Sequence, residues 1–401
     1  MILNKQSPKG WKEVKLHEVL DYEQPTEYIV NSEILGEETQ VPVLTANKGF
    51  IKGYTREKTG ICKNLPVIIF DDFTTDSKFV NFPFKVKSSA MKILKLKDEN
   101  AMLKYIFYQM QTINVRATTH KRYYLSEYQN LHFLFPLDSN KKISFDKQSL
   151  IVQAIETQFT RLDEAVKSLN LVKAKLEVYR KAVLNESFHG DGKTLSQITK
   201  SDKHSIKRGP FGGSLKKEIF VPEGYKVYEQ KHAIQNDFSI GRYYINKEKF
   251  EEMKMFSVKS GDFIISCSGT IGRIAEIPKD AQEGIINQAL LKLSLDSSKI
   301  LNKYFQYVFQ SQFVQRYLTK VSRGVAIKNV PSVKELKTIK FPVPSIQDQQ
   351  SIVQAIESKF SVIDKIETVV EASLEKAEML KKSILKSAFE GKLVKMEEAS
   401  K

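Results

Sequence analysis

The sequence predicts an α+β protein in which two mixed α/β domains are joined by two long antiparallel helices that pair as a coiled coil, with a pseudo-two-fold repeat. Three observations predict this fold class. The chain repeats itself at half its length, each repeat ends in a long amphipathic segment without Gly or Pro, and each long segment follows a globular stretch with short β-type runs.

The internal repeat is the most informative feature of the sequence. Residues 148–159 read QSLIVQAIETQF, and residues 349–360 read QQSIVQAIESKF. The offset of 201 positions holds without a gap for about forty residues, as far as Phe188 and Phe389. Because this offset is half of the 401 residues, the chain is two copies of one plan, a globular segment followed by a helical one.

Each helical segment has a narrow apolar stripe at steps of three and four residues on an otherwise charged surface, which is typical of a coiled coil. Residues 149–189 and 346–390 contain no Gly or Pro, and Gly190 and Gly391 are placed to end the helices. About forty residues give a helix roughly 60 Å long. The stripe residues are Phe159, Leu162, Val166, Leu169, Val172, Leu176, Tyr179 and Val183 in the first segment, and Phe360, Ile363, Ile366, Val370, Leu374, Ala377, Leu380 and Ile384 in the second.

Two helices of equal length that each carry such a stripe are expected to pair with one another. Antiparallel pairing would place the globular domains at opposite ends, related by an approximate two-fold axis. The alternative is two amphipathic helices that pack in separate bundles.

The globular segments, 1–147 and 191–343, are predicted to be mixed α/β domains, followed by helical segments at 148–190 and 344–401. The correspondence between the two globular segments is much weaker than that between the helices. Their β-type runs are 66–70, 91–96 and 262–266, their aromatic helical stretches are 103–111 and 303–312, and each domain ends in a Phe-Pro pair, Phe135-Pro136 and Phe341-Pro342.

The chain is strongly basic, with 63 Lys and Arg against 47 Asp and Glu and a formal net charge of +16. Such a surplus favours a polyanionic partner, because Lys and Arg release counterions from nucleic-acid phosphates. The only two cysteines, Cys62 and Cys267, are far apart, which fits reduced thiols in a cytoplasmic protein. No signal peptide or membrane-spanning run is expected.

Four segments resemble the specificity subunits of Type I restriction–modification systems. The helix start FPVPSIQDQQSIV at 341–353 and the helix end LKSAFEGKLV at 385–394 are similar to the ends of the conserved helix of that family. RGPFGGSLK at 208–216 and GDFIISCSGTIGR at 261–273 resemble its target-recognition domains. The first globular segment has no copy of the Gly-Pro-Phe-Gly run, and its helix begins after a longer connection.

The resemblance implies a fold and a role. The order would be target-recognition domain 1 (1–147), conserved helix 1 (148–190), target-recognition domain 2 (191–343), and conserved helix 2 with a tail (344–401). Each domain would read one half of a split, asymmetric site in double-stranded DNA, and the helices would set the spacer. Two modification subunits with S-adenosylmethionine would dock on the helices, and restriction subunits would then join.

Candidate DNA-binding residues combine hydroxyl, cationic and aromatic groups, which reach phosphates and base edges. The first set lies in the run TTHKRYY and consists of Thr118, Thr119, His120, Lys121, Arg122 and Tyr123. The second set is Lys207 and Arg208, in a basic segment with glycines, and the third is Thr270 and Arg273, in the SGTIGR run. The fourth set is Arg323 and Lys328, which occupy a place in the second domain comparable to that of the first set.

No catalytic residue, metal ligand or cofactor site is predicted. The SGTIGR run lacks the Lys-Ser/Thr of a nucleotide loop and is expected to be a tight turn, and Asp71, Asp72 and Asp76 are expected to be structural rather than a nuclease cluster. No Asn-Pro-Pro-aromatic methyltransferase motif or Walker A motif is present. The alternatives to a Type I subunit are the specificity subunit of a related methyltransferase–endonuclease that cuts beside its site, and a coiled-coil scaffold without a DNA role.

Overall fold

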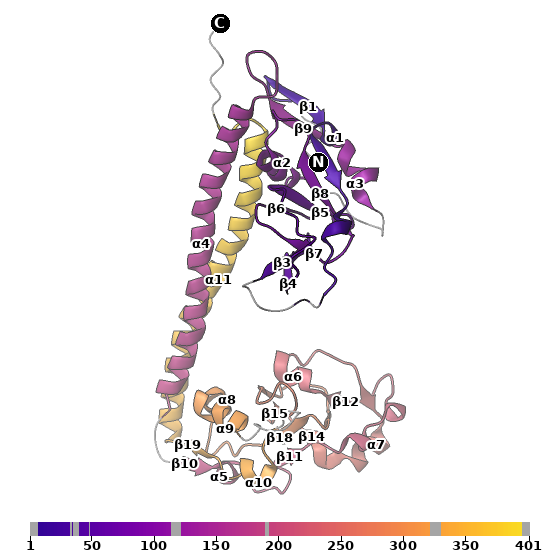
Figure 1. Cartoon of the computed structure of the whole chain (residues 1–401). Helices are drawn as coiled ribbons and strands as arrows, with labels where there is room; N and C mark the ends of the chain where they lie inside the picture. The colour runs from indigo at the N-terminus through magenta and orange to yellow at the C-terminus, as the bar shows by residue number, and fades with distance from the viewer. Residues whose placement is uncertain are drawn as a thin grey trace. The chain divides into compact units, whose positions relative to one another are not determined.

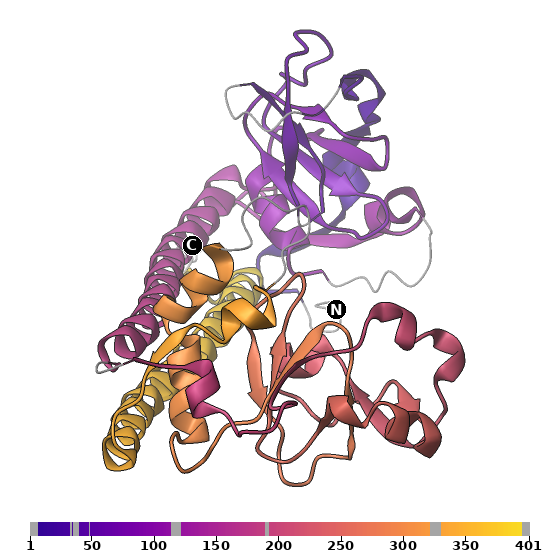
Figure 2. The ribbon, with the colours of Figure 1, turned by 90° about the horizontal axis from the view of Figure 1, so that it is seen from below.

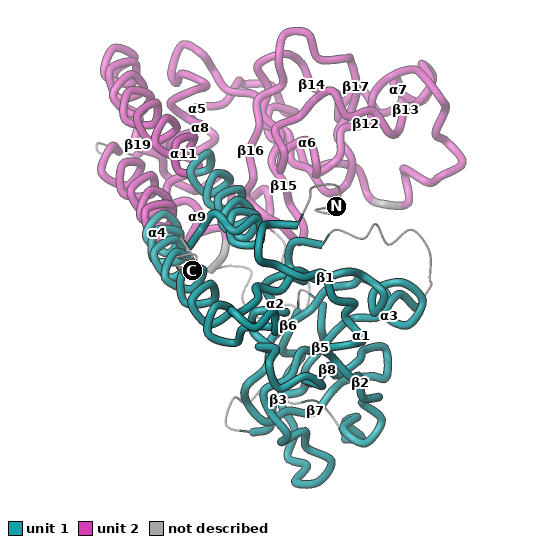
Figure 3. The backbone as a smooth tube through the Cα atoms, turned by 90° about the horizontal axis from the view of Figure 1, so that it is seen from above, with its two compact units in different colours: residues 1–170, 371–401 teal, residues 171–370 magenta. Residues whose placement is uncertain are grey.

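A computed structural model describes residues 7–32, 34, 40–47, 49–113, 122–188, 192–320 and 330–394. The chain divides into two compact units (Figure 3). Unit 1 consists of residues 1–170 and 371–401, and unit 2 consists of residues 171–370. Each unit therefore contains a globular region together with a part of both long helices.

Unit 1 is built on an antiparallel four-stranded sheet of order β2-β8-β5-β6, with a three-stranded sheet β4-β3-β7 and a two-stranded sheet β1-β9. Its strands are β1 (Trp11–Lys15), β2 (Leu20–Glu23), β3 (Val41–Leu44), β4 (Ile51–Thr55), β5 (Val67–Asp71), β6 (Ser77–Val80), β7 (Lys85–Val86), β8 (Met91–Leu96) and β9 (His132–Pro136). Its short helices are α1 (Leu16–Val19), α2 (Leu103–Met110) and α3 (Tyr123–Ser126).

Unit 2 has the antiparallel sheet β11-β18-β15-β16, a mixed sheet β13-β12-β17-β14 and a two-stranded sheet β10-β19. Its strands are β10 (Gly192–Thr194), β11 (Ile206–Arg208), β12 (Tyr225–Tyr228), β13 (Tyr244–Ile245), β14 (Ser257–Val258), β15 (Phe263–Ser266), β16 (Ile274–Glu276), β17 (Gly284–Ile286), β18 (Leu290–Leu293) and β19 (Lys340–Pro342). Its short helices are α5 (Leu195–Ile198), α6 (Gln230–Gln235), α7 (Lys247–Glu252), α8 (Asn302–Gln310), α9 (Gln312–Lys320) and α10 (Val333–Leu336).

The two predicted long helices are present as α4 (Phe145–Glu186, 42 residues) and α11 (Ile346–Phe389, 44 residues). They lie side by side in both views (Figures 1 and 2). Gly391 has a φ of +71° and follows the end of α11, as expected of a C-terminal glycine. The helix α4 ends at Glu186, earlier than predicted, and Gly190 lies outside the described residues.

A buried glutamine fastens the start of each long helix to its globular region. In unit 2 the Gln349 Oε1 accepts the backbone N–H of Leu301 at 2.8 Å, and its Nε2 donates to the carbonyls of Lys299 and Pro344. In unit 1 Gln148, 201 positions earlier, bonds in the same way to Met102 N–H and to the carbonyls of Asn100 and Ser144. Both side chains are 0% exposed, so the repeat extends to the buried hydrogen bonds.

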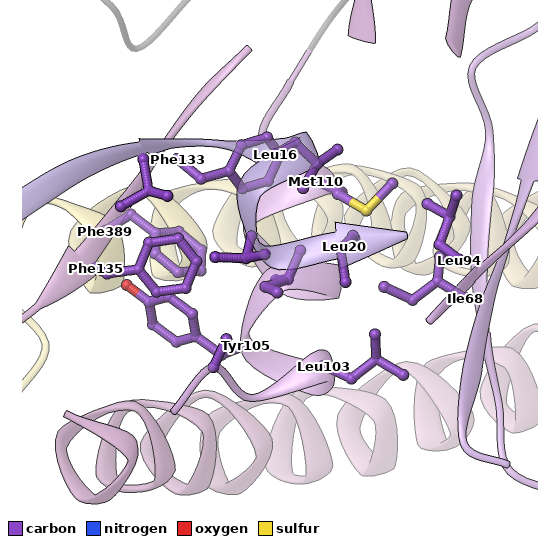
Figure 4. Close-up of a cluster of buried hydrophobic side chains, with 14 of the residues drawn as sticks. Leu16, Leu20, Ile68, Leu94, Leu103, Tyr105, Met110, Phe133, Phe135 and Phe389 are labelled. Carbon is purple, nitrogen blue, oxygen red and sulfur yellow. The ribbon is translucent and has the colours of Figure 1, made fainter. Parts of the chain in front are cut away.

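An aromatic ring fastens the end of each helical segment. Phe389 packs edge-on against Tyr105 of α2 in unit 1, with ring centroids 5.3 Å apart, and lies beside Phe135 in the core (Figure 4). Phe188 packs edge-on against Tyr304 of α8 in unit 2 at 5.6 Å. Because Phe188 and Phe389 are equivalent in the repeat, each globular core is closed by the same contact.

The helix pair is held by two equivalent clusters of a phenyl ring, a cation and a carboxylate. In unit 1 the Lys381 ammonium lies over the Phe159 ring at 5.8 Å and pairs with Asp163 at 2.7 Å. In unit 2 the Arg180 guanidinium lies over the Phe360 ring at 5.0 Å and pairs with Asp364. In both units, residues later in α4 contact residues earlier in α11, so the helices run antiparallel.

The predicted apolar stripe is wrong at four positions. Val172, Tyr179, Ile366 and Leu380 are 38%, 49%, 40% and 49% exposed. Arg180 and Lys381, the neighbours of Tyr179 and Leu380, occupy the inward position instead. A residue there meets an aromatic face and a carboxylate together, and a cation satisfies both while covering the ring with its aliphatic stem.

The glutamine contact yields a stability prediction. Gln349→Leu keeps the side-chain volume but leaves Leu301 N–H and the carbonyls of Lys299 and Pro344 without a partner, so we expect a loss of at least about 2 kcal/mol. Circular dichroism during urea unfolding measures it. The control Gln350→Leu alters the next, exposed glutamine and should leave the midpoint unchanged; equal midpoints for both variants would contradict the anchoring role.

Candidate nucleic-acid interface

Two loops leave the same edge of the β11-β18-β15-β16 sheet, one directly after the predicted DNA-binding residues Lys207 and Arg208 and one that contains the predicted Thr270 and Arg273. Arg208, the last residue of β11, pairs with Leu291, and Ser266, the last residue of β15, pairs with Leu290. Both strands therefore end beside the start of β18. The connections at 209–214 and 267–273 emerge together, although they are far apart in sequence.

The loop at 209–214 is held firmly at its base. Gly209 N–H donates to the carbonyl of Leu290 at 2.8 Å, and a Cβ on Gly209 would stand 1.8 Å from the carbonyl oxygen of Asn287. Pro210 is buried, whereas the next residue, Phe211, is 93% exposed. The first residues of the loop are therefore packed, whereas the aromatic side chain of Phe211 protrudes into solvent.

The loop at 267–273 is the tight turn that the sequence predicted. Gly272 N–H donates to the Ser266 carbonyl, and Arg273 N–H donates to Ser266 Oγ, both at 2.9 Å. Gly269 and Gly272 have φ values of +63° and +75°, which glycine adopts without steric cost. Thr270 and Arg273 are both exposed at this turn.

Exposed cations lie in the 267–273 loop and directly after the 209–214 loop. Lys216, Lys217 and Arg273 are exposed, and among the described residues none of them has a carboxylate within ion-pair distance. Lys207 and Arg208 are half-buried in β11, with the Lys207 ammonium 5.3 Å from the centre of the Phe256 ring. Solvated cations without acidic partners can neutralise phosphates at little desolvation cost.

Residues Thr270 and Arg273 also line a groove of about 700 Å³ within unit 2. Its other walls come from the last turns of α4, including Lys181, and from the α8 glutamines Gln306 and Gln310. The groove is open to solvent and has a mixed lining, in which apolar side chains such as Ile234 and Ile271 lie among polar ones. Its glutamines and Lys181 add hydrogen-bonding groups near Thr270 and Arg273.

Unit 1 repeats this arrangement at the end of β5. Tyr123 N–H donates to the carbonyl of Asp72 at 2.9 Å, and in unit 2 Val330 N–H donates to the carbonyl of Cys267 at 3.0 Å. In unit 1 the bond joins the residue after β5 to the chain that follows residues 114–121. In unit 2 it joins the residue after β15 to the chain that follows residues 321–329. The candidates within those two segments, namely Thr118, Thr119, His120, Lys121, Arg323 and Lys328, lie outside the described residues.

Tyr123 is not available as a contact to a ligand. Its side chain is 3% exposed in the core of unit 1, because its backbone is bonded to Asp72 and turns the ring inward. Arg122, the preceding residue, is exposed. Of the seven-residue run TTHKRYY, Arg122 is therefore the described residue that faces solvent.

The acidic run in unit 1 is structural, as predicted. Asp72 is 2% exposed, accepts the backbone N–H of Tyr124 at 2.9 Å and pairs with the buried Lys92 at 3.4 Å. Asp71 accepts the backbone N–H groups of the following turn, from Phe73 and Thr74. Within the described ranges, no three His, Cys, Asp or Glu side chains are grouped to hold a metal ion.

Cys267 lies at the sheet edge but is not poised as a nucleophile. Burial raises the pKa of its thiol to about 12, so the thiol stays neutral near pH 7. Cys62, in unit 1, is also buried and free. In the part of the chain that the structure describes, no helix has the length and apolar character needed to span a membrane.

Sequence reasoning missed the exposure of Phe211 and the two buried glutamines. The Gly-Pro-Phe-Gly-Gly run contributed to the family resemblance, but it gave no indication that the phenyl ring points to solvent. The glutamines begin the repeated motif, yet a polar residue near a helix start is ordinarily solvated.

Comparisons with known proteins match this architecture. The family model for the Type I restriction modification DNA specificity domain matches residues 212–376. The chain is 31% identical over 373 residues to the Type I restriction enzyme EcoR124I/EcoR124II specificity subunit of Escherichia coli, covering 90% of this chain and 87% of that protein. It is 26% identical over 278 residues to the EcoBI specificity subunit of Escherichia coli, covering 62% and 56%.

Solved structures share the fold. A chain from a study of complex assembly and conformational transition of the type I restriction–modification system superposes with a TM-score of 0.68 at 16% identity, covering 97% of this chain and all of that one. The HsdS subunit from Thermoanaerobacter tengcongensis gives a TM-score of 0.51 at 17% identity, covering 97% and 99%. The architecture is that of a two-domain specificity subunit. The chain belongs to the family of Type I restriction–modification specificity subunits.

The close packing at Gly209, the first residue of the 209–214 loop, can be tested by adding one methyl group. Gly209→Ala places a Cβ against the Asn287 carbonyl, so we expect destabilisation of about 1–3 kcal/mol from overpacking. Gly213→Ala is the matched control, because no atom of the described residues lies within 4 Å of its added Cβ. Thermal unfolding followed by circular dichroism compares the stability of the two variants. A Gly209→Ala variant as stable as the wild type would show that the start of the loop is loosely packed.

Proposed function

We propose that this chain selects the DNA sequence on which a Type I restriction–modification complex acts. The domain at 1–147 reads one half of a split, asymmetric site in double-stranded DNA, and the domain at 191–343 reads the other. The observation that carries the proposal is the contrast between conserved and variable parts of the repeat. The helix anchors are copied from one unit to the other, whereas the loops at the sheet edges differ.

The charge of the sheet edge supports binding to DNA. Lys216, Lys217 and Arg273 offer cations to phosphates, and Thr270 and Arg208 offer hydrogen bonds that can reach base edges. Arg122, with the rest of the predicted run at 118–122, takes the corresponding role in the first domain. Affinity should fall steeply with salt, because each neutralised phosphate releases counterions.

The chemistry belongs to partner subunits. Neither a methyltransferase motif nor a Walker A motif is present in the sequence, and the buried Cys267 is not activated. Modification subunits supply methyl transfer from S-adenosylmethionine, and restriction subunits supply translocation and cleavage. The complex works in the cytoplasm, where the DNA of a bacterial cell is found.

The long helices provide two equivalent docking positions for the modification subunits. Val178 and Tyr179 on α4 are 65% and 49% exposed, and their repeat equivalents Met379 and Leu380 on α11 are 62% and 49% exposed. Exposed apolar pairs are typical of surfaces that a partner covers. Because the two exposed apolar pairs are equivalent in the repeat, they favour the binding of two copies of the same partner subunit. The uninterrupted helix α4, roughly 60 Å long, sets the spacer between the half-sites.

The decisive test of sequence selection is a domain exchange. Residues 1–147 are replaced by the first domain of another family member, and the chimera is expressed with its modification partner. Single-molecule sequencing of methylated adenines should show one half of the recognised site changed and the other half retained. A methylome in which both halves change, or in which no split site is methylated by the wild type, would contradict the proposal.

The two docking positions make a stoichiometric prediction. Val178→Asp should remove one modification subunit from the complex, and Val178→Asp combined with Met379→Asp should remove both, because a charge in an apolar contact is costly to desolvate. Native mass spectrometry counts the subunits. Ser351→Asp adds the same charge at an exposed polar position of α11 and should leave two partners bound; full assembly of the double variant would rule out these positions.

A further inference from the structure

Phe211 is the most exposed large apolar side chain in the described part of the chain, at 93%. Val178, the next, reaches 65%. At such exposure both faces of the phenyl ring are free of protein contact. A ring in this state loses apolar stabilisation while the protein is alone, and gains it only when a ligand covers it.

The backbone of the loop is fastened on both sides of the ring. The buried Pro210 precedes it with a fixed φ, and Gly209 is pressed against the Asn287 carbonyl. On the other side Ser214 N–H donates to the Phe211 carbonyl at 2.9 Å, and Leu215 packs against the core of the second sheet. Binding therefore orders little new backbone.

Gly213, two residues after Phe211, leaves room for a ligand. In the described part of the chain, no atom lies within 4 Å of the position of a Cβ on Gly213, and the φ of this residue does not require glycine. Neither packing nor backbone conformation inside the protein accounts for a glycine at this place. Its absent side chain is accounted for if another molecule's backbone approaches the loop closely.

We propose that Phe211 is an apolar wedge that inserts between base pairs of bound DNA and contributes to recognition of the half-site read by the second domain. The inference rests on the proposed function. An aromatic ring with two free faces matches the stacked faces of neighbouring bases, and Phe is among the side chains that unstack base steps in this way. Lys216 and Lys217 follow on the same stretch of chain and are exposed, so they are available to contact flanking phosphates.

The setting favours DNA over a protein partner as the molecule that covers the ring. The loop shares its sheet edge with Thr270 and Arg273, and its flanks are cationic. The exposed apolar residues proposed to dock the modification subunits lie instead on the long helices. Protein interfaces cluster apolar side chains, whereas Phe211 stands alone among polar and glycine neighbours.

The test uses the full chain assembled with its modification subunits and a duplex that carries the methylated site found by sequencing. Phe211→Ala should bind this duplex about tenfold more weakly, which corresponds to about 1.4 kcal/mol. Its affinity for a duplex without the site should stay within twofold, because phosphate contacts are untouched. Phe313→Ala is the matched control, since Phe313 in unit 2 is also exposed, at 60%, but lies on α9.

A second measurement reports insertion itself. With 2-aminopurine placed in turn at each position of the half-site, the wild-type complex should raise the fluorescence at one base step, because the probe brightens when it is unstacked. Phe211→Ala should abolish that rise. Gly213→Val should keep the unfolding midpoint of the wild type but weaken site binding, since it fills the space that the DNA backbone would occupy.

Three results would overturn the wedge. These are unchanged site affinity of Phe211→Ala, no position of raised fluorescence in the wild-type complex, and loss of modification subunits from the Phe211→Ala complex, which would make the ring a protein contact. The proposed function is judged separately. If the wild-type complex methylates no split site, that function fails, whereas normal methylation with an unaffected Phe211→Ala variant refutes the wedge alone.

Discussion

The attachment of each long helix to a globular core at both ends is the constraint on which the rest of the molecule depends. At the start, a glutamine that is completely buried satisfies three backbone groups. At the end, a phenylalanine packs on a tyrosine of the short helix in the other unit, which the glutamine of the other long helix borders. A buried amide is tolerated only when its hydrogen bonds are complete, so this junction has a single favourable geometry.

The pairing of the helices follows from that geometry. Once Gln148 and Phe389 are fixed in unit 1, the side chains along the pair come into register, and Lys381 meets Phe159 and Asp163. A cation at an inward position specifies register more narrowly than an aliphatic residue, because it must satisfy a ring and a carboxylate at once. The same choice turns Leu380 outward, so the register of the helix pair also determines which apolar residues remain exposed on its surface.

The sequence predicts the parts of this fold that depend on local pattern. The long helices, β8 at Met91–Leu96 and the helix at Leu103–Met110 follow from periodicity and composition. It does not predict features decided by distant contacts. The burial of Tyr123 depends on a bond to Asp72, and the meeting of the loops after β11 and β15 depends on how both strands pair with β18. The stripe was wrong at Tyr179 because periodicity weighs hydrophobicity and cannot detect a phenyl ring on the opposite helix.

The glutamine junction also bears on how such a chain can diverge. The hydrogen bonds that Gln148 and Gln349 make within the described residues go to main-chain atoms, those of Met102 and Leu301 among others. Every residue type except proline presents both a backbone N–H and a carbonyl, so the joint imposes almost no demand on the side chains that surround it. A domain can accumulate substitutions, or be replaced through recombination by one of unrelated sequence, while the joint stays intact. This accounts for a repeat in which the helices stay alike and the domains have drifted far apart.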